Sequence, residues 1–139
     1  MTWIQPATGR CGRLPPGTER NAGSYLRERF GADYVSLGLT FHHGPAPVPP
    51  PDYAEAVLGS AGHDAYLLDL RSGVPPAGVW RWLTAPARTR LVGPGYDPAD
   101  DRAHQLSGGS LAQWFDVIVH WRKVTPARPL RVPHSEPTS

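Results

Sequence analysis

The segment Ser24–Gly44 constrains the fold of this chain more than any other part of the sequence. Leu26 and Phe30 lie four residues apart, as on one face of a short helix, and Gly31 suits the left-handed position that ends a helix. The apolar stretch Tyr34–Phe41 follows at once and predicts a buried strand. Because a helix and a strand that alternate so closely pack as layers, the segment indicates an α/β architecture.

The same alternation continues along the rest of the chain. We expect helices at 21–30, 52–58 (capped by Asp52), 75–84 and 110–114, and strands at 34–41, 65–70, 89–92 and 116–121. The stretch 93–108 is polar and is expected to be a loop. The expected core residues are Leu37, Leu39, Phe41, Leu67, Leu68, Val117 and Val119. The pattern predicts a single layer of about four mostly parallel strands with flanking helices.

The ends of the chain differ in composition from its middle. Residues 1–20 contain three Pro, three Gly and three Arg without an apolar period, so we expect an irregular lead-in there. The folded region is then 21–130, and 131–139 is expected to be a disordered tail. With 139 residues, the chain has room for one domain with a modest core.

Composition argues against several functional classes. No run of about 18 apolar residues occurs, and the N-terminus lacks an apolar signal-peptide core, so we expect no membrane partner and a cytoplasmic protein. Cys11 is the single cysteine, which excludes an internal disulfide or a multi-cysteine metal site. The net charge is +2, and no basic stripe with interleaved aromatic residues appears, so we expect no nucleic-acid partner.

His42 and His43 are the best candidates for a functional site. They lie at the carboxyl end of the expected strand 34–41, where open α/β sheets place their chemistry. Imidazole titrates near neutral pH and suits general acid–base catalysis, although both side chains can equally be partly solvated loop histidines. Adjacent strand residues point to opposite faces, so at most one of them faces a given cleft. No third ligand lies at a recognisable spacing, and we expect no metal and no cofactor.

Asp69 is the third candidate catalytic residue. Asp69 and Arg71 end the expected strand 65–70 on one face, where they can orient a polar substrate, hold a histidine or form a structural ion pair. A serine-nucleophile motif of the G-x-S-x-G type does not occur. The SGGS sequence at Ser107–Ser110 is typical either of an anion-binding turn or of a simple helix cap.

Three stretches together carry a family resemblance: SYLRERFGADYVSLGLTFHHG from Ser24, LLDLR from Leu67 and FDVIVHWRKVTPARPL from Phe115. In this order and rough spacing, they resemble the C-terminal part of the erythromycin esterase family, over about residues 23–130. The resemblance implies a larger α/β domain of which this chain is an incomplete part. It also implies hydrolysis of macrolide lactone esters without a metal, in which a histidine activates water with the help of glutamates.

The chain departs from the family where much of that chemistry lies. The family motif reads roughly Trp-Ala-His-Asn-x-His before the helix that matches 21–30, and here Gln5 and Thr8 stand where the histidines belong. We therefore expect a truncated product, part of a split protein or a binding or interaction module, inactive alone. The expected partner is a small macrolide-like ester, and an uncovered sheet edge is expected to favour self-association.

Overall fold

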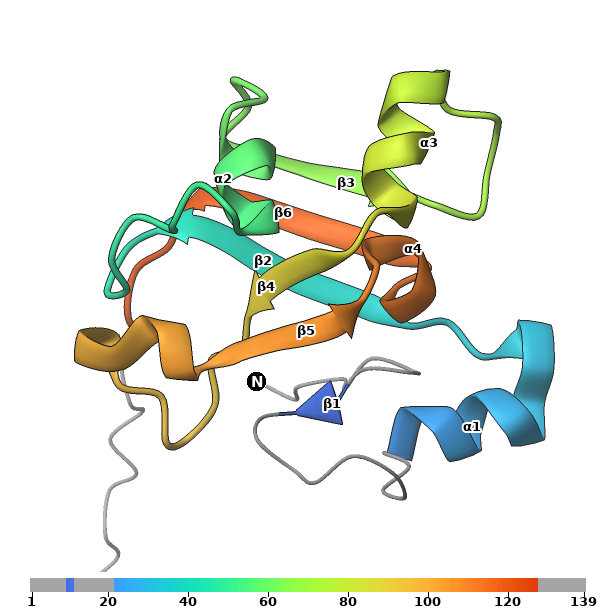
Figure 1. Ribbon diagram of the computed structural model, residues 1–139, viewed down its shortest axis with the longest axis horizontal. Coiled ribbons are helices and arrows are strands. Elements are labelled where there is room, and N and C mark those ends of the chain that lie inside the picture. The colour runs from blue at the N-terminus through green and yellow to red at the C-terminus, as the bar shows by residue number, and fades with distance from the viewer. Residues whose placement is uncertain (1–9, 12–21, 128–139) are drawn as a thin grey trace, which may run out of the picture.

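The described part of the chain, residues 10–11 and 22–127 of a computed structural model, contains two three-stranded sheets (Figure 1). The main sheet has the order β2–β6–β3, and the minor sheet has the order β1–β5–β4. The strand bounds are β1 Arg10–Cys11, β2 Leu37–His43, β3 Ala65–Asp69, β4 Ala87–Arg90, β5 Gln105–Gly109 and β6 Val117–Lys123. The β2–β6 pair is parallel, and the other described strand pairs are antiparallel.

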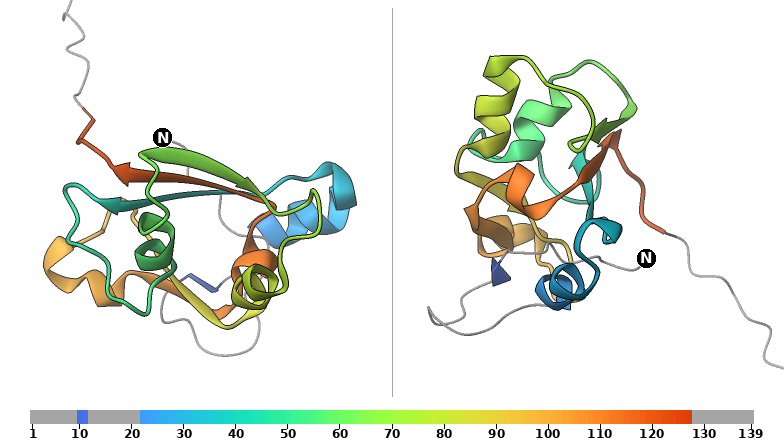
Figure 2. Two further views of the ribbon diagram at one scale, coloured as in Figure 1. Left: turned by 90° about the horizontal axis from the view of Figure 1, so that it is seen from above. Right: turned by 90° about the vertical axis from the view of Figure 1, so that its right-hand side faces the viewer.

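Helices connect the strands. The bounds of the α-helices are α1 Ala22–Phe30, α2 Ala54–Gly59, α3 Ala77–Thr84 and α4 Leu111–Trp114, with 3₁₀ segments at Gly31–Asp33 and Pro98–Ala103. Helices α2, α3 and α4 and the minor sheet lie on the same side of the main sheet (Figure 2). No described helix covers the opposite face of the main sheet (Figure 2). The described helices include none that is long and apolar enough to cross a membrane.

The expected mixture of helices and strands is confirmed, but its arrangement as one mostly parallel layer is only partly correct. The expected strands at 34–41, 65–70 and 116–121 correspond to β2, β3 and β6, yet β3 runs antiparallel to β6. The stretch 89–92 overlaps β4, which belongs to the minor sheet. The expected loop at 93–108 contains most of β5, whose QLSGG sequence lacks an apolar alternation and is held by pairing with β4.

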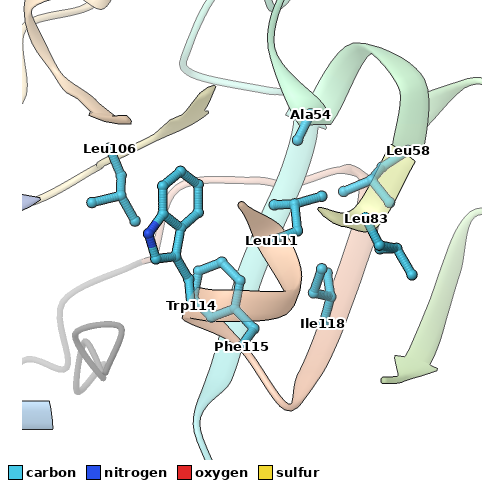
Figure 3. Packing of buried hydrophobic residues seen from close by; sticks show 8 residues of the cluster. All are labelled: Ala54, Leu58, Leu83, Leu106, Leu111, Trp114, Phe115 and Ile118. Atoms are coloured by element: carbon cyan, nitrogen blue, oxygen red, sulfur yellow. The ribbon is translucent and has the colours of Figure 1, made fainter. Parts of the chain in front are cut away.

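The core lies between the main sheet and the elements on its covered side. Ile118 of β6 is fully buried and shares a cluster with Leu111 and Trp114 of α4 and with Leu106 of β5. Figure 3 shows Trp114 and Leu106 side by side at one end of this cluster. The ring of Trp114, at the junction between α4 and β6, therefore belongs to a cluster that connects the two sheets.

Most of the expected core residues on the main sheet lie on the wrong face, whereas Leu68, opposite Ile118, packs against the core as expected. The cross-strand rows Leu39–Val119–Leu67 and Phe41–Trp121–Ala65 lie on the uncovered face. Leu67 is 60% exposed and Leu39 is 38% exposed, so placing them in the core was incorrect. Both faces of these strands carry apolar residues, and the alternation alone could not tell which face the helices cover.

Two further expectations concern the ends of elements. Asp52 does not cap α2, because Tyr53 occupies that position and the Asp52 carboxylate pairs with Arg88. The expected irregular lead-in contains strand β1, which pairs with β5. Gln5, Thr8 and the tail at 131–139 lie outside the described residues.

Candidate functional site

The two candidate histidines meet at the carboxyl end of the parallel β2–β6 pair. Strand β2 ends with His42 and His43, and His43 lies opposite Lys123 of β6. The Nδ1 atoms of the two rings are 3.0 Å apart and the rings are perpendicular. Because a hydrogen bond needs one donor and one acceptor, the pair holds one proton between these two nitrogens. The sequence predicted that the two side chains point to opposite faces, whereas the structure brings their rings into contact at the end of the strand.

The surroundings of His42 favour its neutral form. Partial burial lowers the pKa of His42, and the nearby charges of His43, Arg122 and Arg90 lower the pKa further. The ring rests on α2 at Gly59, where a Cβ would collide with the imidazole. A neutral His42 with a fixed orientation can accept the hydrogen bond of His43 at Nδ1, which orients its neighbour.

A third histidine, His120 of β6, lies beneath this pair on the covered face. It is fully buried, and its Nδ1 atom is 2.9 Å from Oγ1 of Thr40 on the neighbouring strand. Burial lowers the pKa of His120 to about 4, and the charge of His42 adds to the effect. His120 is therefore neutral at pH 7, as expected for a histidine that supports the sheet.

A buried charged cluster next to β2 was not predicted from the sequence. The Arg90 guanidinium donates to both carboxylate oxygens of Asp101 at 2.6 and 2.8 Å, and Tyr96 donates to the same carboxylate at 2.6 Å. Oε1 of Glu55 accepts hydrogen bonds from Thr89 Oγ1 at 2.5 Å and from the Arg90 backbone N–H at 2.9 Å. Burial raises the pKa of Glu55. A glutamate inside the otherwise apolar stretch AEAVLG was the available signal.

The cluster borders an apolar pocket of about 230 Å³ at the same end of β2. The Arg90 guanidinium lies 5.7 Å from the centre of the Phe41 ring, which forms part of the pocket wall. The pocket is lined by Leu39, Thr40, Phe41, Pro45, Ala46, Val92, Tyr96, Pro98, Trp121, Val124 and Thr125. His43 shares the strand face of Leu39 and Phe41, so it is the histidine on the pocket side of β2. A cavity of roughly 150 Å³ holds benzene, so this pocket accommodates an apolar group of ring size.

Asp69 lies at the other end of the main sheet. It is opposite Val117, whereas His43 is opposite Lys123, and six residues at about 3.3 Å each separate the two ends by roughly 20 Å. The Asp69 carboxylate accepts a hydrogen bond from the Arg71 backbone N–H at 2.9 Å, and this bond is the main cause that lowers its pKa. The structure therefore brings His42 and His43 together but does not bring Asp69 to them.

The SGGS turn and the tryptophans also have defined places. Ser110 forms a capping box with Gln113 at the start of α4, in agreement with a helix cap. Trp114 lies in the core, while Trp121 lines the pocket. The residues that the structure describes include no cluster of three or more His, Cys, Asp or Glu that could hold a metal ion.

A family model described as erythromycin esterase matches residues 4–124, which is most of the chain. This chain belongs to the erythromycin esterase family. Comparison with curated proteins finds no match. Two solved structures share the fold of this member of the erythromycin esterase family. One is a Bacillus cereus protein with a TM-score of 0.59 and 23% identity. The match covers 78% of this chain and 29% of that protein. The other is a succinoglycan biosynthesis protein with a TM-score of 0.58 and 24% identity. The match covers 76% of this chain and 28% of that protein.

The chain thus spans less than a third of the length of these two solved relatives. Within residues 22–127, no carboxylate forms an ion pair with His42 or His43. Glu55, the buried glutamate of α2, is engaged with β4 instead. The described part of this family member therefore has a histidine pair and an apolar pocket without a carboxylate to orient them.

Proposed function

We propose that this chain provides one part of an ester-hydrolase site of the erythromycin esterase type and does not open macrolide lactones alone. The proposal rests on the His42–His43 pair, which lies beside an apolar pocket but has no carboxylate partner in the described residues. His43 is the candidate base that faces the bound ester: its Nδ1 carries the shared proton and donates it to Nδ1 of His42, which leaves Nε2 of His43 free to accept a proton from water. Asp69 is too distant to take part in the same step.

The expected inactivity follows from the missing groups. Water attack on an ester needs a base that takes a proton from water and donors that stabilise the oxyanion. A positioned base contributes about 10²–10⁴-fold, and one oxyanion donor contributes about 10²–10³-fold. A base gives this factor only when a partner fixes its tautomer and the site excludes water. The histidine pair alone does not meet these conditions.

The test is incubation of the purified chain with erythromycin, followed by mass-spectrometric detection of the ring-opened acid. We expect no product above that of a blank. The variants His42→Ala and His43→Ala are measured alongside His63→Ala, an exposed histidine whose ring packs against Tyr66. Turnover that is lost in His42→Ala or His43→Ala but kept in His63→Ala would refute the proposal and make the chain a minimal esterase.

A non-catalytic ligand-binding module is the second candidate function, and the pocket favours it. Its wall is almost wholly apolar and includes the rings of Phe41, Tyr96 and Trp121. Calorimetric titration with erythromycin in the same preparation distinguishes the two candidates. Binding without turnover that is abolished by Val92→Phe, which fills the pocket, supports the module. If erythromycin does not bind, the function as a ligand-binding module is ruled out.

A further inference from the structure

The uncovered face of the main sheet, here called the open face, extends beyond the pocket of the proposed function, with which it shares Leu39, Phe41 and Trp121. Its two central rows, Leu39–Val119–Leu67 and Phe41–Trp121–Ala65, contain no charged residue. Leu67 is 60% exposed and Leu39 is 38% exposed, although both are large apolar side chains. Contiguous apolar surface of this kind marks an interface rather than a solvated face.

The open face carries opposite charges at its two ends. At the carboxyl end of β6, Lys123 lies opposite His43, and no described carboxylate forms an ion pair with this lysine. At the other end, the exposed Asp69 lies opposite Val117. The neighbouring Arg71 directs its guanidinium to the Ala32 carbonyl oxygen at 3.1 Å. The face is thus apolar along its middle, basic at one end and acidic at the other.

Such a pattern is complementary to itself when one copy is reversed. A two-fold axis in the plane of the interface, at right angles to the strands, places the basic end of one copy over the acidic end of the other. The same axis stacks the central apolar rows against each other, and face-to-face sheets pack about 10 Å apart. Lys123 then lies within side-chain reach of Asp69 of the partner subunit, and this contact occurs twice in each dimer.

We propose that two copies of this chain form a two-fold dimer through the open face. The dimer differs from edge-to-edge pairing, which would add backbone hydrogen bonds at β2 or β3 and would leave β6 unchanged. Val119 lies on the central strand of the sheet, so only packing across the face can bury its side chain further. Dependence of assembly on side chains of the open face is therefore specific to this arrangement.

The test is light scattering after size-exclusion chromatography of the full chain without any ligand. We expect a mass of twice the 15.1 kDa of one chain. Leu67→Glu should give a monomer with an unchanged circular dichroism spectrum, because the side chain is exposed in the single copy. Val74→Glu is the matched control: Val74 is 97% exposed but lies outside the main sheet, and this variant should remain a dimer.

Charge exchange tests the orientation of the two copies. Lys123→Asp and Asp69→Lys should each weaken the dimer by roughly tenfold in Kd, since each places like charges together twice. The double variant restores opposite charges and should recover the affinity of the natural chain. A monomeric natural chain, an assembly larger than a dimer, or a dimer insensitive to Leu67→Glu would each overturn the proposal. Failure of the double variant to recover affinity would overturn the orientation. None of these outcomes depends on hydrolysis or ligand binding.

Discussion

At the scale of single residues, His120 links the stability of the sheet to pH. The pKa of this histidine falls from 6.5 to about 4, chiefly because burial disfavours the charged ring. In the unfolded chain, His120 binds a proton below about pH 6.5, whereas in the folded chain it remains neutral until about pH 4. The unfolded state therefore binds more protons between these values, and the stability of the folded state decreases as the pH falls through this window.

The expected loss is about 1.4 kcal/mol per unit of pKa shift, or roughly 3 kcal/mol across the window. Urea unfolding at about pH 7.5 and about pH 5, at one fixed protein concentration, measures part of this loss of stability. The variant His120→Gln should show a smaller difference between the two pH values, while His63→Gln, at an exposed position, should behave as the natural chain. Glu55 has a raised pKa and titrates in the opposite sense, so the comparison between variants isolates His120. An equal pH dependence in His120→Gln would contradict this explanation.

At the scale of elements, the contact between β2 and the segment before β6 depends on a glycine. A Cβ at Gly38 would lie 2.9 Å from the Phe115 ring, which is less than a van der Waals contact. The ring is buried and lies over the strand, so it has little room to move. Gly38 therefore allows Phe115 to approach the covered face of the main sheet closely.

We expect Gly38→Ala to reduce the free energy of unfolding by about 1–3 kcal/mol because it overpacks this contact. Gly78→Ala is a matched control: Gly78 lies in α3, and a Cβ added there would meet no heavy atom within 4 Å, so alanine should stabilise the helix by about 0.5–1 kcal/mol. Urea unfolding of both variants measures the two effects. Equal effects of the same sign would show that Gly38 is not limited by Phe115.

The same strands show what the sequence could and could not predict. Strands β2, β3 and β6 were predictable because their apolar stretches are bounded by turn residues. Which face is covered was not predictable, since the covered face includes Thr40 and His120, two polar residues that are compatible with burial because they contact each other. His42 and His43 were identifiable as candidates because they follow a predicted strand, but their mutual contact was not, since adjacent strand residues are expected to point to opposite faces. The Glu55–Arg90 contact joins residues 35 positions apart, and no local pattern reports such a contact.

At the scale of the whole molecule, the two sheets share one core. Leu106 comes from the minor sheet and Ile118 from the main sheet, and both belong to the cluster around Trp114. Polar contacts add to this connection, since Glu55 of α2 accepts hydrogen bonds from Thr89 and Arg90 at the end of β4. Neither sheet can lose its packing without exposing the apolar residues of the other, which is the condition for cooperative unfolding.

We therefore expect the described region to unfold in a single transition. Leu106→Ala, a change in the minor sheet, should cost about 2–5 kcal/mol because it leaves a cavity in the shared core. The loss should appear equally in the hydrogen exchange of the Val119 amide in β6 and of the Thr89 amide in β4. Val74→Ala is the control, because this exposed side chain lies outside the cluster and its loss should change the exchange of both amides by less than about 0.5 kcal/mol. If Leu106→Ala accelerated exchange at Thr89 and left Val119 protected, the two sheets would be separate folding units and the shared core would not control stability.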